Sequence, residues 1–157
     1  ACKMVVPTID LLAKHYNSKD SARLKLWGEK TLKSYEKFGK NAKRDLGTDD
    51  PVELGKMVNK WLIDYVTSGP LIALLLEGKH AVQNVINLTG PTMPVDAPAG
   101  TIRGDFSTDS AAYANAEKRG VMNLVHVSTS AQEANFEKSL WFSPSEIHNY
   151  KRAEELL

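Results

Sequence analysis

The strongest constraint on the fold lies between residues 50 and 76, where an amphipathic helix is followed directly by a short apolar run. Asp50, Pro51 and Glu53 supply a helix cap, a proline at the first helical position and an acid in the first turn. Apolar side chains then recur at helical spacing as far as a Ser-Gly-Pro sequence that ends the helix. The apolar run 71–76 has the length of a strand and predicts a central, buried one.

Further helices and strands are predicted on both sides of this unit. In chain order they are a strand at 2–7, a helix at 8–16 capped by Thr8, a helix at 80–88, a helix at 109–119, a strand at 122–127, a helix at 130–140 and a short helix from Ser143. A proline-rich loop at 90–100 separates the helices at 80–88 and 109–119. Strands and helices alternate without a Rossmann glycine fingerprint or a P-loop. This pattern favours an α+β sandwich, with helices covering a small sheet, in a single domain over residues 1–157.

The composition excludes several classes of partner and site. A net charge of +1 gives no general reason to expect nucleic acid, so any phosphate binding must come from a local site. Cys2 is the single cysteine, which excludes an internal disulfide and a multi-cysteine metal site. No apolar run reaches transmembrane length, and no membrane partner is expected.

Residues 17–50 are rich in lysine and arginine, and their apolar residues Leu24, Trp27, Tyr35 and Phe38 suit an amphipathic helix. One interpretation is a solvated helix with a cationic outer face. The other is an electrostatic lip that attracts polyphosphates.

A candidate catalytic group follows the strand predicted at 122–127. In a strand, His126 and Ser128 face the same side. Ser130 can cap the next helix, with Glu133 as its reciprocal partner, and that helix could fold back and aim Glu137 at one ring nitrogen of His126. The other nitrogen would then be a fixed acceptor, suited to a nucleophile or a general base. Without further signals, a lone histidine on a strand is more often structural.

Several separated motifs, taken together, resemble those of the nucleoside diphosphate kinase family. The matching motifs are Gly-Thr-Ile-Arg-Gly-Asp-Phe at 100–106, preceded by Ala99 in place of proline, Asn-x-x-His-x-Ser at 123–128, Glu137, and Leu-Trp-Phe at 140–142. Their order makes the resemblance specific over residues 67–150, roughly half of the chain.

The resemblance implies a ferredoxin-like fold with a mostly antiparallel sheet. It also implies an enzyme, a phosphotransferase that moves the γ-phosphoryl group of a nucleoside triphosphate to a nucleoside diphosphate by a ping-pong mechanism through a phosphohistidine. Mg²⁺ would arrive with the nucleotide, held chiefly by phosphates, so no protein metal ligand is expected. A homo-oligomer, a hexamer or tetramer, and a cytoplasmic location are further expectations.

By the same resemblance, His126 is the nucleophile, Glu137 the orienting carboxylate and Ser128 the hydroxyl that helps to place it. The nucleotide- and phosphate-binding candidates are Arg103, Thr92, Asn123 and Tyr16. Each has a purely structural alternative: a salt bridge from Arg103 to Asp105 or Asp109, turn roles for Thr92 and Asn123, and packing for Tyr16. The other histidines, His15, His80 and His148, are expected to be surface or capping residues.

Some features depart from the family pattern. The sequence begins at a segment that matches the family's second strand, and a fragment of a longer protein is the favoured explanation for the absence of the first strand and its phosphate-binding lysine. Ile86 stands where an arginine is usual, Val127 replaces a glycine, and residues 17–50 are expected to be a helical insertion. The absent lysine and Ile86 favour an alternative function, an impaired nucleotide-binding or scaffold protein on the same fold.

Overall fold

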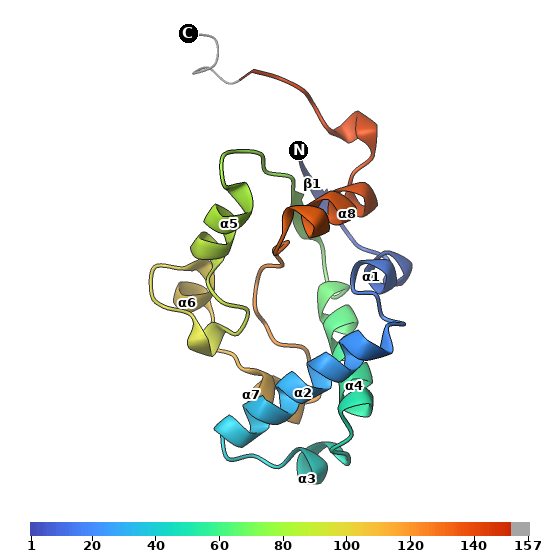
Figure 1. The fold of residues 1–157 in the computed structure, drawn as a ribbon, viewed down its shortest axis with the longest axis vertical. Coiled ribbons are helices and arrows are strands. Elements are labelled where there is room, and N and C mark those ends of the chain that lie inside the picture. Colours follow the sequence, from blue (N-terminus) through green and yellow to red (C-terminus); the bar gives the residue numbers. More distant parts are fainter. Residues whose placement is uncertain (152–157) are drawn as a thin grey trace.

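The structure, a computed structural model that describes residues 1–151, consists of helices and one two-stranded antiparallel sheet, which lies toward the end of the molecule that holds the N-terminus (Figure 1). The elements are β1 (Cys2–Val5), α1 (Ile9–His15), α2 (Ser21–Lys37), α3 (Ala42–Leu46), α4 (Pro51–Val66), β2 (Leu71–Leu74), α5 (Ala81–Thr89), η1 (Pro94–Asp96), α6 (Ile102–Phe106), α7 (Ala111–Ala116), α8 (Ala131–Trp141) and η2 (Pro144–Glu146). The α+β class predicted from the sequence is confirmed. Within the described part of the chain, none of the helices combines the length and apolarity needed to span a membrane.

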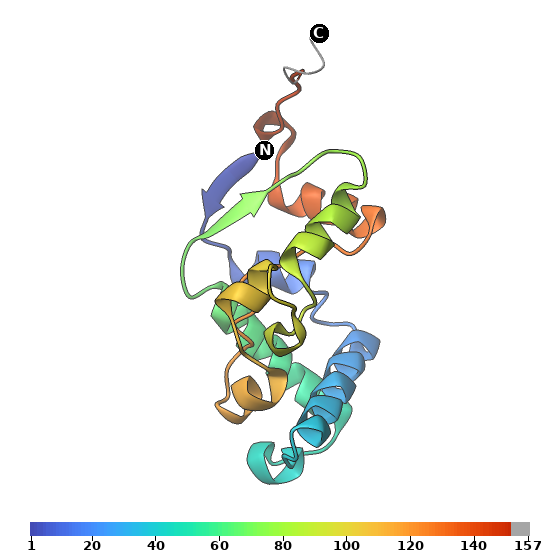
Figure 2. The same ribbon diagram turned by 90° about the vertical axis from the view of Figure 1, so that its left-hand side faces the viewer.

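The sheet is smaller and less buried than the sequence predicts. β1 and β2 pair from Cys2 opposite Leu74 to Val5 opposite Leu71, and α5 and α8 lie to one side of them (Figure 2). Among residues 1–151 β2 has a strand partner on one edge alone. Ile72 and Leu74, which share one face of β2, are 53% and 57% exposed. The prediction of a central, buried strand at 71–76 is therefore wrong on both counts.

The prediction of a strand at 122–127 is also wrong. Its backbone turns at Leu124, which adopts a φ of 69°, and short bonds run from Asn123 N–H to the Val121 carbonyl and from Val125 N–H to the Asn123 carbonyl. Such local turns replace the ladder hydrogen bonds that a strand requires. Val127, by contrast, lies outside the positive-φ region, so this β-branched residue costs no such strain.

Helices α2 and α4 pack against each other unusually closely because each has a glycine at the contact. A Cβ atom on Gly28 would lie 1.8 Å from the Pro51 carbonyl oxygen, and one on Gly55 would lie 1.9 Å from that of Leu24. The helices run antiparallel, since residue 24 meets residue 55 and residue 28 meets residue 51. Within residues 17–50 the structure has the two helices α2 and α3, and both of them contact α7.

The largest buried apolar cluster lies between these helices and α7, away from the sheet. Its buried members are Tyr35, Ala42, Leu54 and Ala112. Helix α7 is shorter than the predicted helix at 109–119, because Asp109 and Arg119 lie outside it and form an ion pair with each other at 2.5 Å.

Replacing Gly55 with alanine tests the close helix contact. Alanine favours a helix interior over glycine by about 1 kcal/mol, but here its methyl group would overlap the Leu24 carbonyl. We expect the free energy of unfolding, measured by urea denaturation, to fall by about 2 kcal/mol or more. Gly78→Ala, where a Cβ meets no atom within 4 Å, serves as the control. A Gly55→Ala variant as stable as this control would contradict the packing.

Candidate active site

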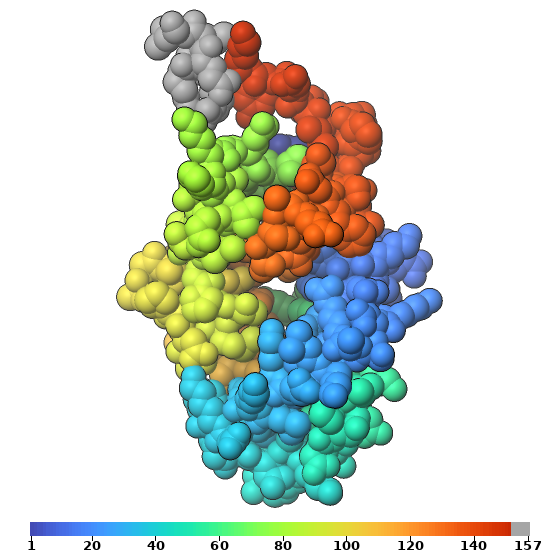
Figure 3. Space-filling model, in the orientation of Figure 1, coloured from blue at the N-terminus to red at the C-terminus, as the bar shows by residue number. Residues whose placement is uncertain are grey.

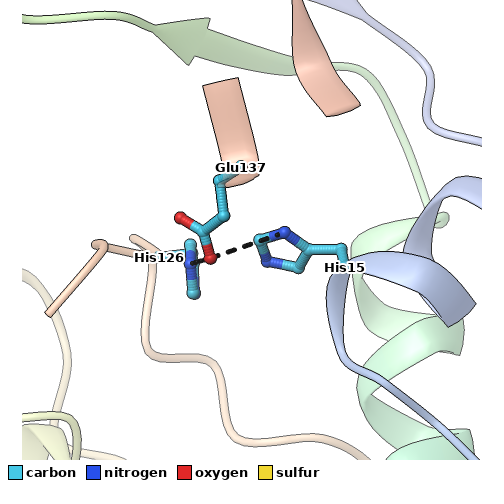
Figure 4. A group of neighbouring side chains, drawn as sticks. All are labelled: His15, His126 and Glu137. Carbon is cyan, nitrogen blue, oxygen red and sulfur yellow. Dashed lines mark hydrogen bonds and ion pairs between the residues drawn. The ribbon is translucent and has the colours of Figure 1, made fainter. Parts of the chain in front are cut away.

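Helix α8 carries Glu137 into contact with His126, as the sequence predicts (Figure 4). His126 Nε2 lies 2.8 Å from Glu137 Oε1, and the Ser128 hydroxyl donates to Glu137 Oε2. The cap of α8 differs in detail from the predicted capping box. Ser130 Oγ accepts the Glu133 N–H, but the Glu133 carboxylate accepts the N–H of Thr129 instead of that of Ser130.

The hydrogen bond to Glu137 determines which ring nitrogen of a neutral His126 carries the proton. Burial alone would raise the pKa of Glu137, but the hydrogen bonds from His126 and Ser128 outweigh it and hold that pKa below its usual value. An ionised carboxylate accepts only, so the proton of a neutral His126 must sit on Nε2. Its Nδ1 then keeps a free lone pair and has no hydrogen-bond partner among residues 1–151. The His126 side chain is 42% exposed, so this nitrogen belongs to an accessible ring.

His15 was expected on the surface or at a cap, and this prediction is wrong. It is 5% exposed and belongs to the same cluster: its Nδ1 lies 3.6 Å from Glu137 Oε1, and its ring meets that of His126 edge-on at 4.5 Å. Nδ1 also accepts a hydrogen bond from the indole N–H of Trp141, at 3.1 Å. The sequence held a signal for this position, because His15 follows Leu11 and Leu12 at helical spacing and so shares the apolar face of α1.

Tyr16 is also brought into the cluster. It is 7% exposed and its ring lies edge-on to those of His15, at 4.5 Å, and His126, at 6.1 Å. Burial, and then the Glu137 carboxylate, raise the pKa of the Tyr16 hydroxyl to about 12. The hydroxyl therefore remains protonated at neutral pH and can act as a donor.

Arg103 forms neither of the salt bridges considered for it, since Asp109 pairs with Arg119 and Asp105 accepts from the Gly100 N–H. It is 5% exposed, and its guanidinium donates to three backbone carbonyls: those of Asn123 at 3.1 Å, Gly90 at 2.5 Å, and Val125. Burial lowers its pKa, though not enough to discharge a guanidinium. Arg103 thus ties the chain after α5 to the segment that leads into His126.

The remaining site candidates differ in how deeply they are buried. Asn123 is half-buried and accepts from Arg103 through its carbonyl, while Thr92 is exposed in the loop between α5 and η1. Ile86 is half-buried on α5. The surface has a hollow at the centre of one face, bordered by α8, the first turns of α2 and the chain that follows α5 (Figure 3).

His15, His126 and Glu137 bring three potential metal-ligand atoms within 4.8 Å of one another. One nitrogen of each ring already has a hydrogen-bond role: His15 Nδ1 accepts from Trp141, and His126 Nε2 donates to Glu137. The side chains of the cluster thus already bond to one another and to Trp141, and we assign no metal to it.

Comparison with known proteins places the chain in a family. The family model described as nucleoside diphosphate kinase matches residues 52–147. A nucleoside diphosphate kinase of Pyrobaculum aerophilum is 44% identical over 147 residues, which cover 94% of this chain and 80% of that protein. One of Archaeoglobus fulgidus is 46% identical over 94 residues, which cover 60% of this chain and 56% of the relative. The chain belongs to the nucleoside diphosphate kinase family.

Solved structures agree with this assignment. The crystal structure of an NDP kinase from Pyrobaculum aerophilum has a TM-score of 0.87 at 43% identity, over 95% of this chain and 81% of that one. A nucleoside diphosphate kinase from Borrelia burgdorferi, solved as a transition-state mimic with vanadate and ADP, has a TM-score of 0.71 at 29% identity, over 99% and 75%. The ferredoxin-like α+β fold expected from the resemblance is thereby confirmed.

Removing Arg103 tests its structural role. In Arg103→Met, three backbone carbonyls lose a charged donor at a buried site, and each such bond is worth about 1.5–3 kcal/mol. We expect the free energy of unfolding to fall by about 3 kcal/mol or more, measured by urea denaturation. Arg44→Met is the matched control, because Arg44 is exposed and bonds to its neighbour Asp45. Equal stability of the two variants would show that the carbonyl contacts do not hold the segment.

Burial of neutral His15 makes stability depend on pH. Burial and nearby His126 lower the pKa of His15 from 6.5 to about 4. Between these two pH values, His15 is protonated in the unfolded chain and neutral in the folded chain. The free energy of unfolding of the wild type should therefore fall between pH 6.5 and 4, by up to about 1.4 kcal/mol per pH unit from this group. His15→Phe should flatten this dependence and His148→Gln, at an exposed site, should not. Parallel curves for His15→Phe and the wild type would rule out a depressed pKa.

Proposed function

We propose that this chain is the phosphoryl-transfer unit of a nucleoside diphosphate kinase, with His126 as its nucleophile. The observation that supports it best is the hydrogen bond from His126 Nε2 to Glu137, which leaves the lone pair on Nδ1. In the first step Nδ1 attacks the γ-phosphorus of a nucleoside triphosphate, the bond to the β–γ bridging oxygen breaks, and the nucleoside diphosphate leaves. In the second, a terminal phosphate oxygen of another diphosphate attacks the same phosphorus and the P–N bond breaks.

Glu137 and Ser128 have positioning roles in this scheme. As His126 Nδ1 gains a bond to phosphorus, positive charge develops on the ring, and the Glu137 carboxylate stabilises it through Nε2–H. Ser128 holds the other carboxylate oxygen, so that Glu137 cannot turn away from His126. Glu137 is 8% exposed, and its burial strengthens both interactions because water does not compete for them.

The phosphates would lie near the hollow of Figure 3, since residues 120–128 pass through the centre of the same view in Figure 1. The protonated hydroxyl of Tyr16 suits a donor to phosphate oxygens, and we propose contacts from Thr92 and Asn123 as well. We also propose that Arg103 donates to the phosphates through the two N–H groups of its guanidinium that its three backbone bonds do not use. Phosphoryl transfer depends mainly on such positioning and charge stabilisation.

Mg²⁺ would enter with the triphosphate and neutralise part of its charge. The acidic side chains of α8 close to His126 are already engaged, Glu137 with His126 and Ser128 and Glu133 with Thr129. This supports a cation held chiefly by phosphate oxygens. A homo-oligomer and a cytoplasmic location remain predictions from the family resemblance.

Labelling with γ-³²P-ATP and Mg²⁺ tests the proposal. We expect the wild type to retain an acid-labile, base-stable label that a nucleoside diphosphate removes, and we expect His126→Ala to retain none. Ser128→Ala should be labelled about tenfold more slowly, because a hydrogen bond to a charged group is worth about 1.5 kcal/mol or more. His80→Gln, on an exposed residue at the start of α5, is the control. A folded wild type that binds nucleotide but takes up no label would contradict the proposal.

A further inference from the structure

Two residues of α8 lie at the same ring nitrogen of His15, and each of them favours a different tautomer of that ring. Trp141 lies four residues after Glu137, on the same face of α8. The Trp141 indole N–H donates to His15 Nδ1 at 3.1 Å, and Glu137 Oε1 lies 3.6 Å from that same nitrogen. An indole nitrogen can only donate, so Nδ1 must be the acceptor and the proton of neutral His15 must sit on Nε2.

The alternative tautomer would disturb the nucleophile. With its proton on Nδ1, His15 could donate to Glu137 Oε1 after a small movement, since the two atoms are 3.6 Å apart. Glu137 Oε1 is the oxygen that accepts from His126, at 2.8 Å. Two imidazoles would then compete for one oxygen. For part of the time His126 would lack its hydrogen bond to Glu137, and its ring would be free to turn.

We propose that Trp141 and His15 form a positioning pair for the nucleophile, in which the indole N–H fixes the tautomer of His15 and so reserves Glu137 for His126. The catalytic consequence rests on the proposed function of His126. The tautomer itself does not, because it follows from the hydrogen bond between Trp141 and His15.

The surroundings of His15 keep it neutral, so that its tautomer and not its charge is what Trp141 controls. The ionisable groups that act on it are His126, the two carboxylates Glu133 and Glu137 of α8, and Arg23 of α2. The ring of Tyr16, the residue that follows it, also faces His15. Burial is the largest influence and, with His126 and Arg23, lowers the pKa of His15 to about 4 against the opposing pull of the two carboxylates. At neutral pH the ring therefore carries one proton, and the question is on which nitrogen.

The kinetic test compares Trp141→Phe, His15→Phe and the double variant in the labelling of His126. Trp141→Phe keeps an aromatic ring but removes the donor, and we expect labelling to slow about three- to tenfold, the effect of one hydrogen bond. The double variant should regain most of this loss, because the competing imidazole is gone. Trp61→Phe, a half-buried tryptophan of α4, is the matched control and should label at the wild-type rate. Thermal unfolding of each variant verifies that it is folded.

A purely structural role for the pair gives a different pattern. The double variant would then label as slowly as Trp141→Phe or more slowly, and this result would overturn the proposal. The pH profile adds a second readout. Without the indole donor, the lone pair of His15 Nδ1 is more basic, so the acid limb of the labelling rate should move to higher pH in Trp141→Phe and not in the double variant.

Nitrogen NMR of ¹⁵N-histidine-labelled protein tests the tautomer directly. In the wild type, the His15 resonances should show a protonated Nε2 and an unprotonated Nδ1, and Trp141→Phe should shift the proton toward Nδ1. His80 and His148 are exposed references. A protonated Nδ1 in the wild type would overturn the proposal whatever the activity. A wild type that takes up no label but shows the expected tautomer would instead refute the proposed function and leave the tautomer assignment standing.

Discussion

A carboxylate removed from water must receive hydrogen-bond donors in exchange, and the arrangement of the site depends on this requirement at Glu137. Its two oxygens are met by His126 and Ser128, which lie two residues apart. The burial that makes this carboxylate costly also makes its contacts strong, because the surrounding medium screens them weakly. The same exchange orders His126, so the protonation and the orientation of the proposed nucleophile have one physical cause.

Arg103 meets a second requirement, which is to hold the backbone before His126 without a strand. The carbonyls of residues 123 and 125 would be ladder acceptors in a sheet, and here a single guanidinium takes them while also bonding to Gly90. A planar fork can serve several acceptors at once, which an ammonium group cannot do with the same geometry. Arg103 therefore holds the segment before His126 in place, and Glu137 orients the ring of His126.

Local signals in the sequence predicted much of the fold and of the catalytic group. The caps at Thr8, Asp50 and Ser130, the amphipathic helix after Pro51 and the contact between Glu137 and His126 all follow from spacing over a few residues. The strand at 122–127 failed because strand formation depends on a partner elsewhere in the chain, and apolar residues alone do not supply one. The buried bonds of Arg103 were missed for the same reason, since their acceptors are backbone atoms that any residue offers. His15 was missed although helical spacing placed it on an apolar face, because its partners Trp141 and Glu137 lie more than a hundred residues away.

Helix α8 sets a limit on how this region of the sequence can change. Glu137 and Trp141 reach the same histidine because they are one turn apart, whereas the exposed Ser139 between them lies off that face. Substitutions at such outward positions leave the alignment intact. The loss or gain of a single residue between the two rotates whatever follows by about 100° around the helix axis, and one partner of His15 is carried out of reach. In α8, residue identity is therefore open to variation on the outer face, but the number of residues is not.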